Sequence, residues 1–180
     1  MPVQSLFGGA MSIDIPVGMV DISNFREVPD NQEVFANAST DQSVIVEILE
    51  SVEQQGHEAI KFHFEQLAET NEAPNTHVIK SSDVNVDNIP QAYMLVGQQQ
   101  VAKFNEREQG SNSVLVVLAL LRVPEHTADI LVSLNAPVSV SEHSSSYKAI
   151  DMIAVDADKA TGEFEQMLHS FKINDFSLFG

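Results

Sequence analysis

A short acidic segment contains the residues whose types and spacing most clearly indicate chemistry. It reads Arg26-Glu-Val-Pro-Asp-Asn-Gln-Glu33. Pro29 restricts its own φ, and the side chains of Asp30 and Asn31 can hydrogen-bond to the backbone of a bend, so a surface turn is expected here. The turn would present the carboxylates of Glu27, Asp30 and Glu33 together. Such a corner suits a cationic partner, or it is an ordinary acidic turn in contact with solvent.

A second group of residues, His57, His63 and Glu65, has the composition of a metal site. Successive residues of a helix are about 100° apart, so His57 and His63 point to different faces of the helix expected here. His63 lies on an apolar stripe with Ile60 and Phe64, where a histidine is usually a hydrogen-bonded core residue. We therefore expect no metal site.

The charge of the chain excludes several classes of function. Its 180 residues include 9 Lys or Arg and 26 Asp or Glu, for a formal net charge of −17. Nucleic acid and anionic lipid both repel so acidic a protein, so we expect neither nucleic acid nor a membrane as partner. A basic protein surface is the natural complement. The longest apolar run, residues 114–121, is far shorter than the ~20 residues that a membrane-spanning helix needs.

Motifs of enzymes and cofactor-binding proteins are absent. The sequence has no cysteine, which excludes disulfides and thiolate ligands. It has no Gly-x-x-x-x-Gly-Lys-Ser/Thr or Gly-x-Gly-x-x-Gly loop to hold a nucleotide phosphate. Its N-terminus lacks the features of a secretory signal or transit peptide. We therefore expect no bound cofactor.

Apolar residues recur at helical spacing in three segments, which predict three helices. The first is residues 44–52, with Ser39 and Gln42 as its expected capping box. The second is the stretch between Gly56 and Asn71. The third is residues 164–171, with Thr161 as its expected N-cap. Between them the pattern is that of β-strands. Residues 114–121 are apolar at every position, as in a strand at the centre of a sheet and covered on both faces. A turn at 124–127 joins this strand to residues 129–135 as an antiparallel hairpin. Further strands are expected at residues 9–16, 33–36, 77–81 and 92–104.

These elements predict a single α+β domain over residues 1–180, with a mostly antiparallel sheet sandwiched between helices. The length supports one core, because a chain of this size buries roughly 70% of its unfolded surface. The polar, serine-rich stretch at about 139–161 is expected to be a variable surface loop, in which residues 147–153 could form a short helical turn.

Seven short motifs occur in order along the chain. They are Phe7-Gly-Gly-Ala, Val28-Pro-Asp-Asn-Gln-Glu-Val-Phe35, Ile45-Val-Glu-Ile-Leu-Glu50, Phe62-His-Phe-Glu-Gln-Leu-Ala68, Gln99-Gln-Val-Ala-Lys-Phe-Asn-Glu106, Leu118-Ala-Leu-Leu-Arg122 and Asp129-Ile-Leu-Val-Ser-Leu-Asn135. Together they resemble the Ran guanine-nucleotide release factor family, also called the Mog family. The resemblance runs from about residue 6 to the C-terminus and leaves only residues 139–161 without a counterpart.

The resemblance implies an α/β/α sandwich, a fold shared with the plant extrinsic photosystem proteins. It also implies a protein that binds the small GTPase Ran and promotes release of its guanine nucleotide in nucleocytoplasmic transport. In the family, the acidic pair of the Pro-Asp-x-Gln-Glu motif is central to Ran binding, and this pair falls on Asp30 and Glu33. Asn31 and Gln32 lie in the same motif, where contact with Ran and a purely structural role both stay open. Glu27 and Arg26 are included as candidate contacts with Ran only because they are neighbours of this motif in the sequence.

Two other classes of function stay open. An adaptor could hold a basic partner such as a trafficking cargo without releasing nucleotide. An enzyme could use Asp30 and Glu33 as an acid–base pair, although no nucleophile or metal accompanies them. Because nucleotide release breaks no covalent bond, we expect a non-enzymatic regulator. We expect a monomer in both nucleus and cytoplasm, since a chain of 19.7 kDa can diffuse through nuclear pores.

Overall fold

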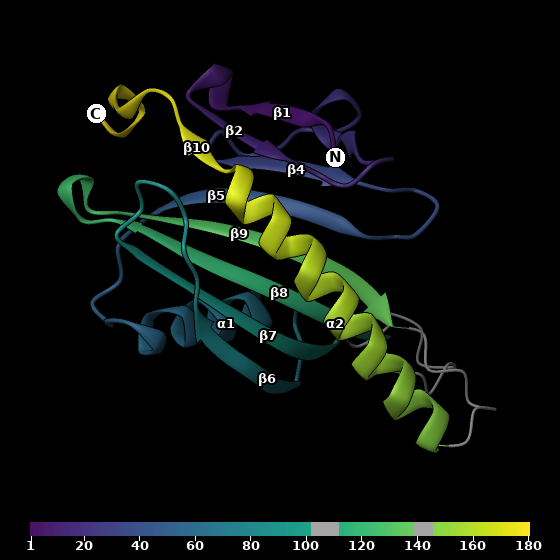
Figure 1. The fold of residues 1–180 in the computed structure, drawn as a ribbon. Helices are drawn as coiled ribbons and strands as arrows, with labels where there is room; N and C mark the ends of the chain where they lie inside the picture. Colours follow the sequence, from purple (N-terminus) through teal and green to yellow (C-terminus); the bar gives the residue numbers. More distant parts are fainter. Residues whose placement is uncertain (102–111, 139–145) are drawn as a thin grey trace.

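The computed structural model describes the backbone of residues 1–101, 112–138 and 146–180, and the side chains of residues 1–100, 113–138 and 157–180. Two helices and ten strands follow one another along these residues (Figure 1). They are β1 (Val3–Leu6), β2 (Met11–Asp14), β3 (Val20–Asp21), β4 (Gln32–Ala36), β5 (Ser43–Glu50), α1 (His57–Thr70), β6 (Asn75–Asp83), β7 (Gln91–Val101), β8 (Asn112–Val123), β9 (Ala128–Val138), α2 (Ser146–Ser170) and β10 (Lys172–Ile173). Short 3-10 turns include η1 (Phe7–Gly9) and η2 (Ile22–Asn24).

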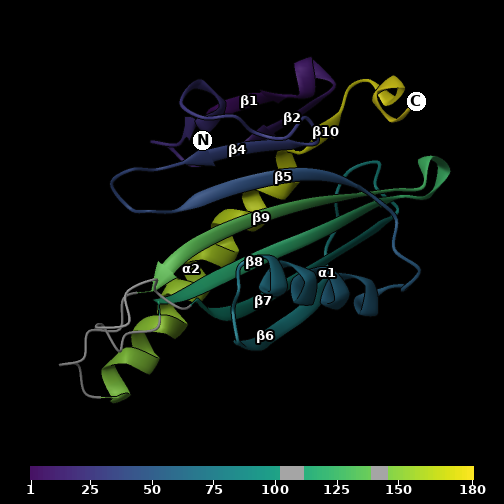
Figure 2. The same cartoon turned by 180° about the vertical axis from the view of Figure 1, so that it is seen from behind.

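The core of the fold is an antiparallel sheet of seven strands in the order β3-β4-β5-β9-β8-β7-β6. Helix α2 crosses one face of this sheet, and α1 covers part of the other, as the two opposite views show (Figures 1 and 2). A small sheet, β1-β2-β10, packs beside α2. The predicted α+β fold with an antiparallel sheet between helices is therefore confirmed.

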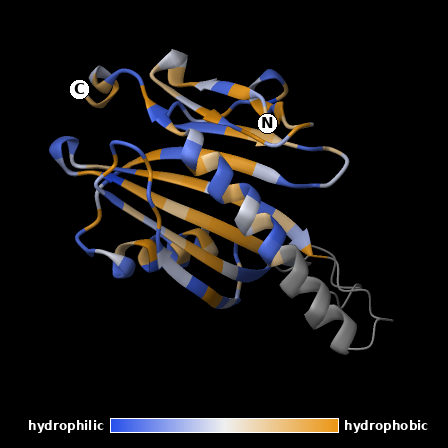
Figure 3. Cartoon of the chain, in the orientation of Figure 1, coloured by the Kyte–Doolittle hydropathy of each residue, from blue (hydrophilic) through white to orange (hydrophobic). Residues whose placement is uncertain are grey.

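The place of β8 between two cores explains why residues 114–121 are apolar at every position. Its alternate residues Leu115, Val117 and Ala119 belong to the core under α2. The residues between them, Val116, Leu118 and Leu120, belong to the core under α1. Side chains alternate between faces with a period of two, so a strand covered on both faces is apolar throughout, as the colouring by hydropathy shows (Figure 3).

Most of the predicted strands are found close to their expected bounds. The hairpin is confirmed as β8 and β9, and β9 rather than β8 is the middle strand of the seven. The segments expected at 9–16, 33–36, 77–81 and 92–104 contain β2, β4, β6 and β7. The end of the last of them falls on residues 102–104, outside the described residues.

The helix predicted at residues 44–52 is wrong, because this segment forms strand β5. Val44 and Val46 are fully buried, whereas Ile45 and Glu47 between them are only partly buried, which is the alternation of a strand. β-branched side chains favour strands, and eight paired positions with β9 decide the conformation. Ser39 and Gln42 therefore cap no helix, and they lie in the connection from β4 to β5.

The helix predicted between Gly56 and Asn71 is confirmed as α1, with Asn71 as its C-cap; the Asn71 backbone N–H makes the last bond of the helix, to Leu67 O. The C-terminal helix is longer than predicted, because α2 already begins at Ser146. Thr161 is not its cap, since the Thr161 hydroxyl donates to Ala157 O within the helix at 2.6 Å. Residues 146–161 of the expected loop are therefore helical, and residues 139–145 lie outside the described residues. Frequent alanine after Ser146 favours a helix, which the serine-rich start of the segment obscured.

A glycine in β7 is required by the packing of α1 on the sheet. A Cβ atom on Gly97 would lie 2.5 Å from Cζ of the buried Phe64 ring. We expect Gly97→Ala to lower the free energy of unfolding by about 1–3 kcal/mol, since the ring must move. Urea unfolding measures this change. Gly162→Ala in α2 is the matched control, because its Cβ would meet nothing within 4 Å, and it should not destabilise. Equal stability of the two variants would contradict the packing argument.

Candidate functional site

The acidic turn, defined as residues 26–33, connects η2 to β4 and is held firmly on the sheet. The backbone N–H of Gln32 donates to Pro29 O at 3.0 Å, which closes the bend. Asn31 is bonded twice to Ile48 of β5: its carbonyl accepts from Ile48 N at 2.9 Å, and its Nδ2 donates to Ile48 O at 3.1 Å. These bonds give Asn31 a structural role. The turn therefore has a defined conformation before any partner binds.

The two acidic residues of the Pro-Asp-x-Gln-Glu motif have different environments. Asp30 is exposed, and its carboxylate has no hydrogen-bond partner among the described residues. Glu33 is partly buried, and its Oε1 accepts from the backbone N–H of Phe7 at 2.7 Å. Arg26 and Glu27 are exposed beside them. All six predicted residues lie in the acidic turn, but their side chains do not share one surface: Asp30, Arg26 and Glu27 are exposed, Glu33 joins β4 to η1, and Asn31 and Gln32 bond to β5.

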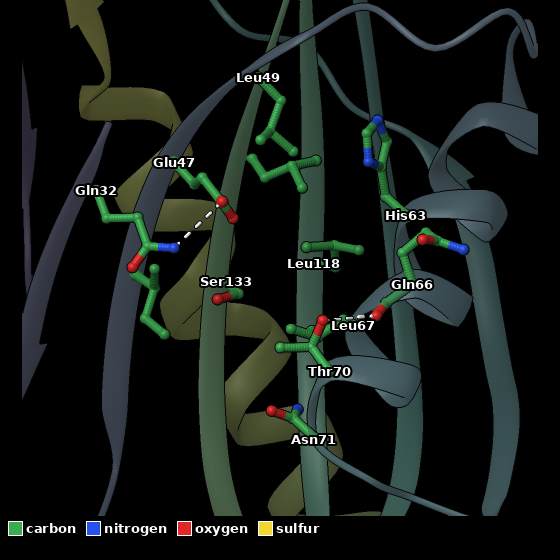
Figure 4. A pocket seen from close by; sticks show the side chains of 12 residues that line it. Gln32, Glu47, Leu49, His63, Gln66, Leu67, Thr70, Asn71, Leu118 and Ser133 are labelled. Carbon is green, nitrogen blue, oxygen red and sulfur yellow. Dashed lines mark hydrogen bonds between the residues drawn. The ribbon is translucent and has the colours of Figure 1, made fainter. Parts of the chain in front are cut away.

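Gln32 points to the opposite side of β4 from Glu33, because side chains alternate along a strand. Its Nε2 donates to Oε1 of Glu47, the residue directly across from it on β5, at 3.2 Å. Both side chains form one wall of a groove of about 330 Å³ between β5 and α1 (Figure 4). Gln32 therefore connects the acidic turn to this groove.

The groove has a mixed lining. Its twelve residues come from β4 and β5, from α1 and the residue after it, and from β8 and β9: Gln32, Ile45, Glu47, Leu49, His63, Gln66, Leu67, Thr70, Asn71, Leu118, Leu131 and Ser133. Figure 4 shows Gln66, Thr70 and Asn71 on the α1 side and Gln32 and Glu47 on the opposite side of the groove, with the Gln66 amide directed away from them. Nothing in the sequence predicted this groove, since residues 44–52 were expected to be helical.

Beside the groove lies a buried ionic network that the sequence analysis also missed. Asp129 is fully buried, and Arg122, directly opposite it on β8, is 4% exposed. Arg122 Nε donates to Asp129 Oδ1 at 2.7 Å, and Nη2 donates to Oδ2 at 3.1 Å. His63 Nε2 lies 2.8 Å from Asp129 Oδ2, which confirms His63 as a hydrogen-bonded core residue. The sequence did contain one signal for this pair. Arg122 and Asp129 lie at equal distances before and after the predicted hairpin turn, a position that places them opposite each other.

The network keeps both ionisable partners charged. Burial by itself raises the pKa of Asp129, but hydrogen bonds from His63 and Arg122 outweigh it and hold the pKa well below the ordinary value of 3.8. The hydrogen bond to Asp129 raises the pKa of Arg122 against the opposite effect of burial. Arg122 Nη1 also donates to Gln54 O at 2.8 Å, so the network fixes the connection between β5 and α1.

The lowered pKa of Asp129 predicts how its contribution to stability depends on pH. The unfolded chain binds a proton at Asp129 near pH 4, whereas the folded chain does not, so protons favour unfolding below about pH 4. We expect the stability gap between the wild type and Asp129→Asn to be constant above about pH 5. Below about pH 4 it should narrow by up to about 1.4 kcal/mol per pH unit. Urea unfolding at several pH values measures the gap, and a gap independent of pH would contradict the assignment.

His57 makes a second set of hydrogen bonds, at the edge of the sheet. Its Nδ1 lies 2.7 Å from Ser81 Oγ and its Nε2 lies 2.7 Å from Asp83 Oδ1. The His57 and Asp83 side chains are 47% and 81% exposed, and pairs open to water interact weakly. We interpret this set as an attachment of the start of α1 to β6. Within the described residues, no three His, Asp or Glu side chains are placed to hold a metal ion, and no helix is long and apolar enough to cross a membrane.

Known proteins resemble this chain over nearly its whole length. The sequence profile described as "Ran-interacting Mog1 protein" matches residues 4–137. A Danio rerio protein named Ran guanine nucleotide release factor is 39% identical, over 98% of this chain and 99% of its own length. The Saccharomyces cerevisiae nuclear import protein MOG1 is 28% identical, over 97% of this chain and 83% of its own length. The crystal structure of the Saccharomyces cerevisiae Ran-binding protein Mog1p has a TM-score of 0.78 at 25% identity, covering 99% of this chain and 98% of that one. This chain belongs to the Ran-interacting Mog1 protein family.

Proposed function

We propose that this protein binds the small GTPase Ran and promotes release of its guanine nucleotide, acting as a non-catalytic regulator of nucleocytoplasmic protein transport. The observation that carries the proposal is the match, over nearly the full length, to relatives named Ran guanine nucleotide release factor. The net charge of −17 agrees with it, because an acidic protein associates fast with a basic partner surface.

The acidic turn is the contact surface in this proposal. Asp30 supplies an exposed carboxylate from a rigid turn, so little conformational entropy is lost when a cation of Ran pairs with it. Glu33 supplies the second charge, with one oxygen already bonded to Phe7 N. Glu27 and Arg26 are exposed in the same turn and lie at the edge of the proposed contact surface. Asn31 and Gln32 act by positioning, since their amides are bonded to β5.

Nucleotide release follows from competition for positive groups. A GTPase holds the nucleotide phosphates with a lysine, backbone N–H groups and Mg²⁺. A carboxylate of the acidic turn that pairs with a cation near this site weakens the hold on the phosphates. Linkage makes the effect reciprocal, so bound nucleotide weakens binding of this protein to Ran by the same factor.

The remaining features of the proposal concern the state of the protein. It acts as a single domain and as a monomer, without a cofactor. It works in both nucleus and cytoplasm, which agrees with a mass of 19.7 kDa and with relatives named for nuclear import.

The proposal is tested by the dissociation of a fluorescent guanine nucleotide from Ran in excess unlabelled nucleotide, with and without this protein. We expect faster dissociation in its presence, and a parallel titration by isothermal calorimetry should detect binding to Ran. Binding without faster release would replace the proposal with the adaptor function. Absence of binding would overturn the assignment of Ran as partner.

A further inference from the structure

The groove between β5 and α1 has the chemistry of a site for one cationic side chain. Glu47 is the only carboxylate among its lining residues, and the lining contains no lysine or arginine. Within the described residues, the Glu47 carboxylate accepts a hydrogen bond only from the neutral amide of Gln32, and no Lys, Arg or His nitrogen lies within 4 Å of it. A partly buried carboxylate without a cation is stabilised by gaining one.

The other lining residues match the stem of a lysine or arginine. Ile45, Leu49, Leu67, Leu118 and Leu131 all line the groove, and Figure 4 shows Leu118 between the β5 side and α1. Long basic side chains place their methylene groups along apolar surface and their charge at a polar end. A volume of about 330 Å³ is at the lower limit for a small-molecule site, which favours a single side chain over an organic ligand.

The groove is continuous with the acidic turn. Gln32 belongs to the turn, and its amide reaches the Glu47 carboxylate in the groove wall. Asp30 is two residues before Gln32 in the chain, so a protein that contacts Asp30 is also close to the groove wall at Gln32. Because that partner must be basic to complement the turn, it is the natural source of the cationic side chain.

We propose that the groove between β5 and α1 receives a lysine or arginine side chain of Ran, whose cationic group pairs with Glu47. This inference rests on the proposed binding of Ran, and it extends the contact surface from the acidic turn to the opposite side of β4. Glu47 determines specificity in this arrangement, because only a partner with a long basic side chain at the matching position forms an ion pair with it.

Two groove variants and one matched control test the inference. Glu47→Gln removes the charge and keeps the shape of the side chain. We expect it to raise the Kd for Ran about 10-fold and to reduce the salt dependence of binding. Thr70→Trp fills the groove from the exposed side of α1, and we expect a similar loss. Glu65→Gln makes the same change of charge on the part of α1 outside the groove and should alter the Kd less than about 2-fold.

The measurement is calorimetric titration of Ran with each variant at two salt concentrations, with circular dichroism to confirm that each variant is folded. Wild-type affinity in both Glu47→Gln and Thr70→Trp would overturn the groove inference and leave the proposed function standing. An equal loss in Glu47→Gln and Glu65→Gln would also overturn it, because only net charge would then matter. If the wild type itself did not bind Ran, the proposed function would fail, and the groove inference would fall with it.

Discussion

Asp129→Ala lowers the free energy of unfolding by about 3–5 kcal/mol, the largest effect we expect from a single substitution in this protein. The Asp129 carboxylate is fully buried, and besides Arg122 and His63 it accepts from Ser51 Oγ at 3.1 Å and from Val52 N at 3.2 Å. Alanine removes the carboxylate that pairs with the buried Arg122 guanidinium and leaves several donors without this acceptor. Because domains of this kind are stable by about 5–15 kcal/mol, the loss is a large fraction of the total.

Urea unfolding at neutral pH measures this effect, and Asp83→Ala is the matched control. Asp83 also pairs with a histidine, but its side chain is 81% exposed, so its removal should cost less than about 1 kcal/mol. If the two variants lost equal stability, the buried network would not be the stabilising element that its geometry indicates. The network also connects β9 to α1, so a destabilised Asp129→Ala protein should lose affinity for Ran through unfolding rather than through lost contact.

Asp30→Asn should weaken Ran binding about 10–100-fold while leaving the stability of the free protein within about 0.5 kcal/mol of the wild type. Asp30 is exposed and without a hydrogen-bond partner among the described residues, so its carboxylate contributes to binding rather than to folding. Calorimetric titration with Ran and urea unfolding measure the two quantities. Nucleotide release at a fixed protein concentration should slow in proportion to the lost affinity. Unchanged affinity in Asp30→Asn would remove Asp30 from the proposed contact surface.

Glu33 requires a different design, because its carboxylate has a partner within the chain. Glu33→Gln keeps an oxygen that accepts from Phe7 N and removes only the charge, whereas Glu33→Ala removes both. We expect both variants to bind Ran more weakly, and only Glu33→Ala to lose about 1–3 kcal/mol of stability as well. If Glu33→Gln bound Ran like the wild type, Glu33 would be a structural residue of the turn and not part of the contact surface.

Much of the fold follows from local pattern. Residues 114–121 are apolar at every position, and this alone predicted a strand covered on both faces. The turn residues at 124–127 predicted the hairpin, and helical spacing predicted α1. Residues 44–52 show where local pattern fails, because Val44, Ile45 and Ile48 fit a helical stripe as well as a strand. Pairing with β9, which is remote in sequence, decided between the two.

The sequence predicted the position of the acidic turn from Pro29, but not how the turn is held. Asp30 and Asn31 were expected to bond to the bend through their side chains; among the described residues the bend is closed by the backbone bond from Gln32 N to Pro29 O, and Asn31 Nδ2 donates to Ile48 O of β5 instead. The partners of its side chains were decided only by the tertiary structure. Glu33 meets Phe7 across 26 residues and His63 meets Asp129 across 66, and strand register and helix packing set both contacts. The groove at Glu47 exists because α1 packs over β6, β7 and β8 and leaves the β4 and β5 side of that face open. Local sequence specifies which conformation a segment prefers, whereas burial of the two faces of the sheet determines which remote side chains share one site.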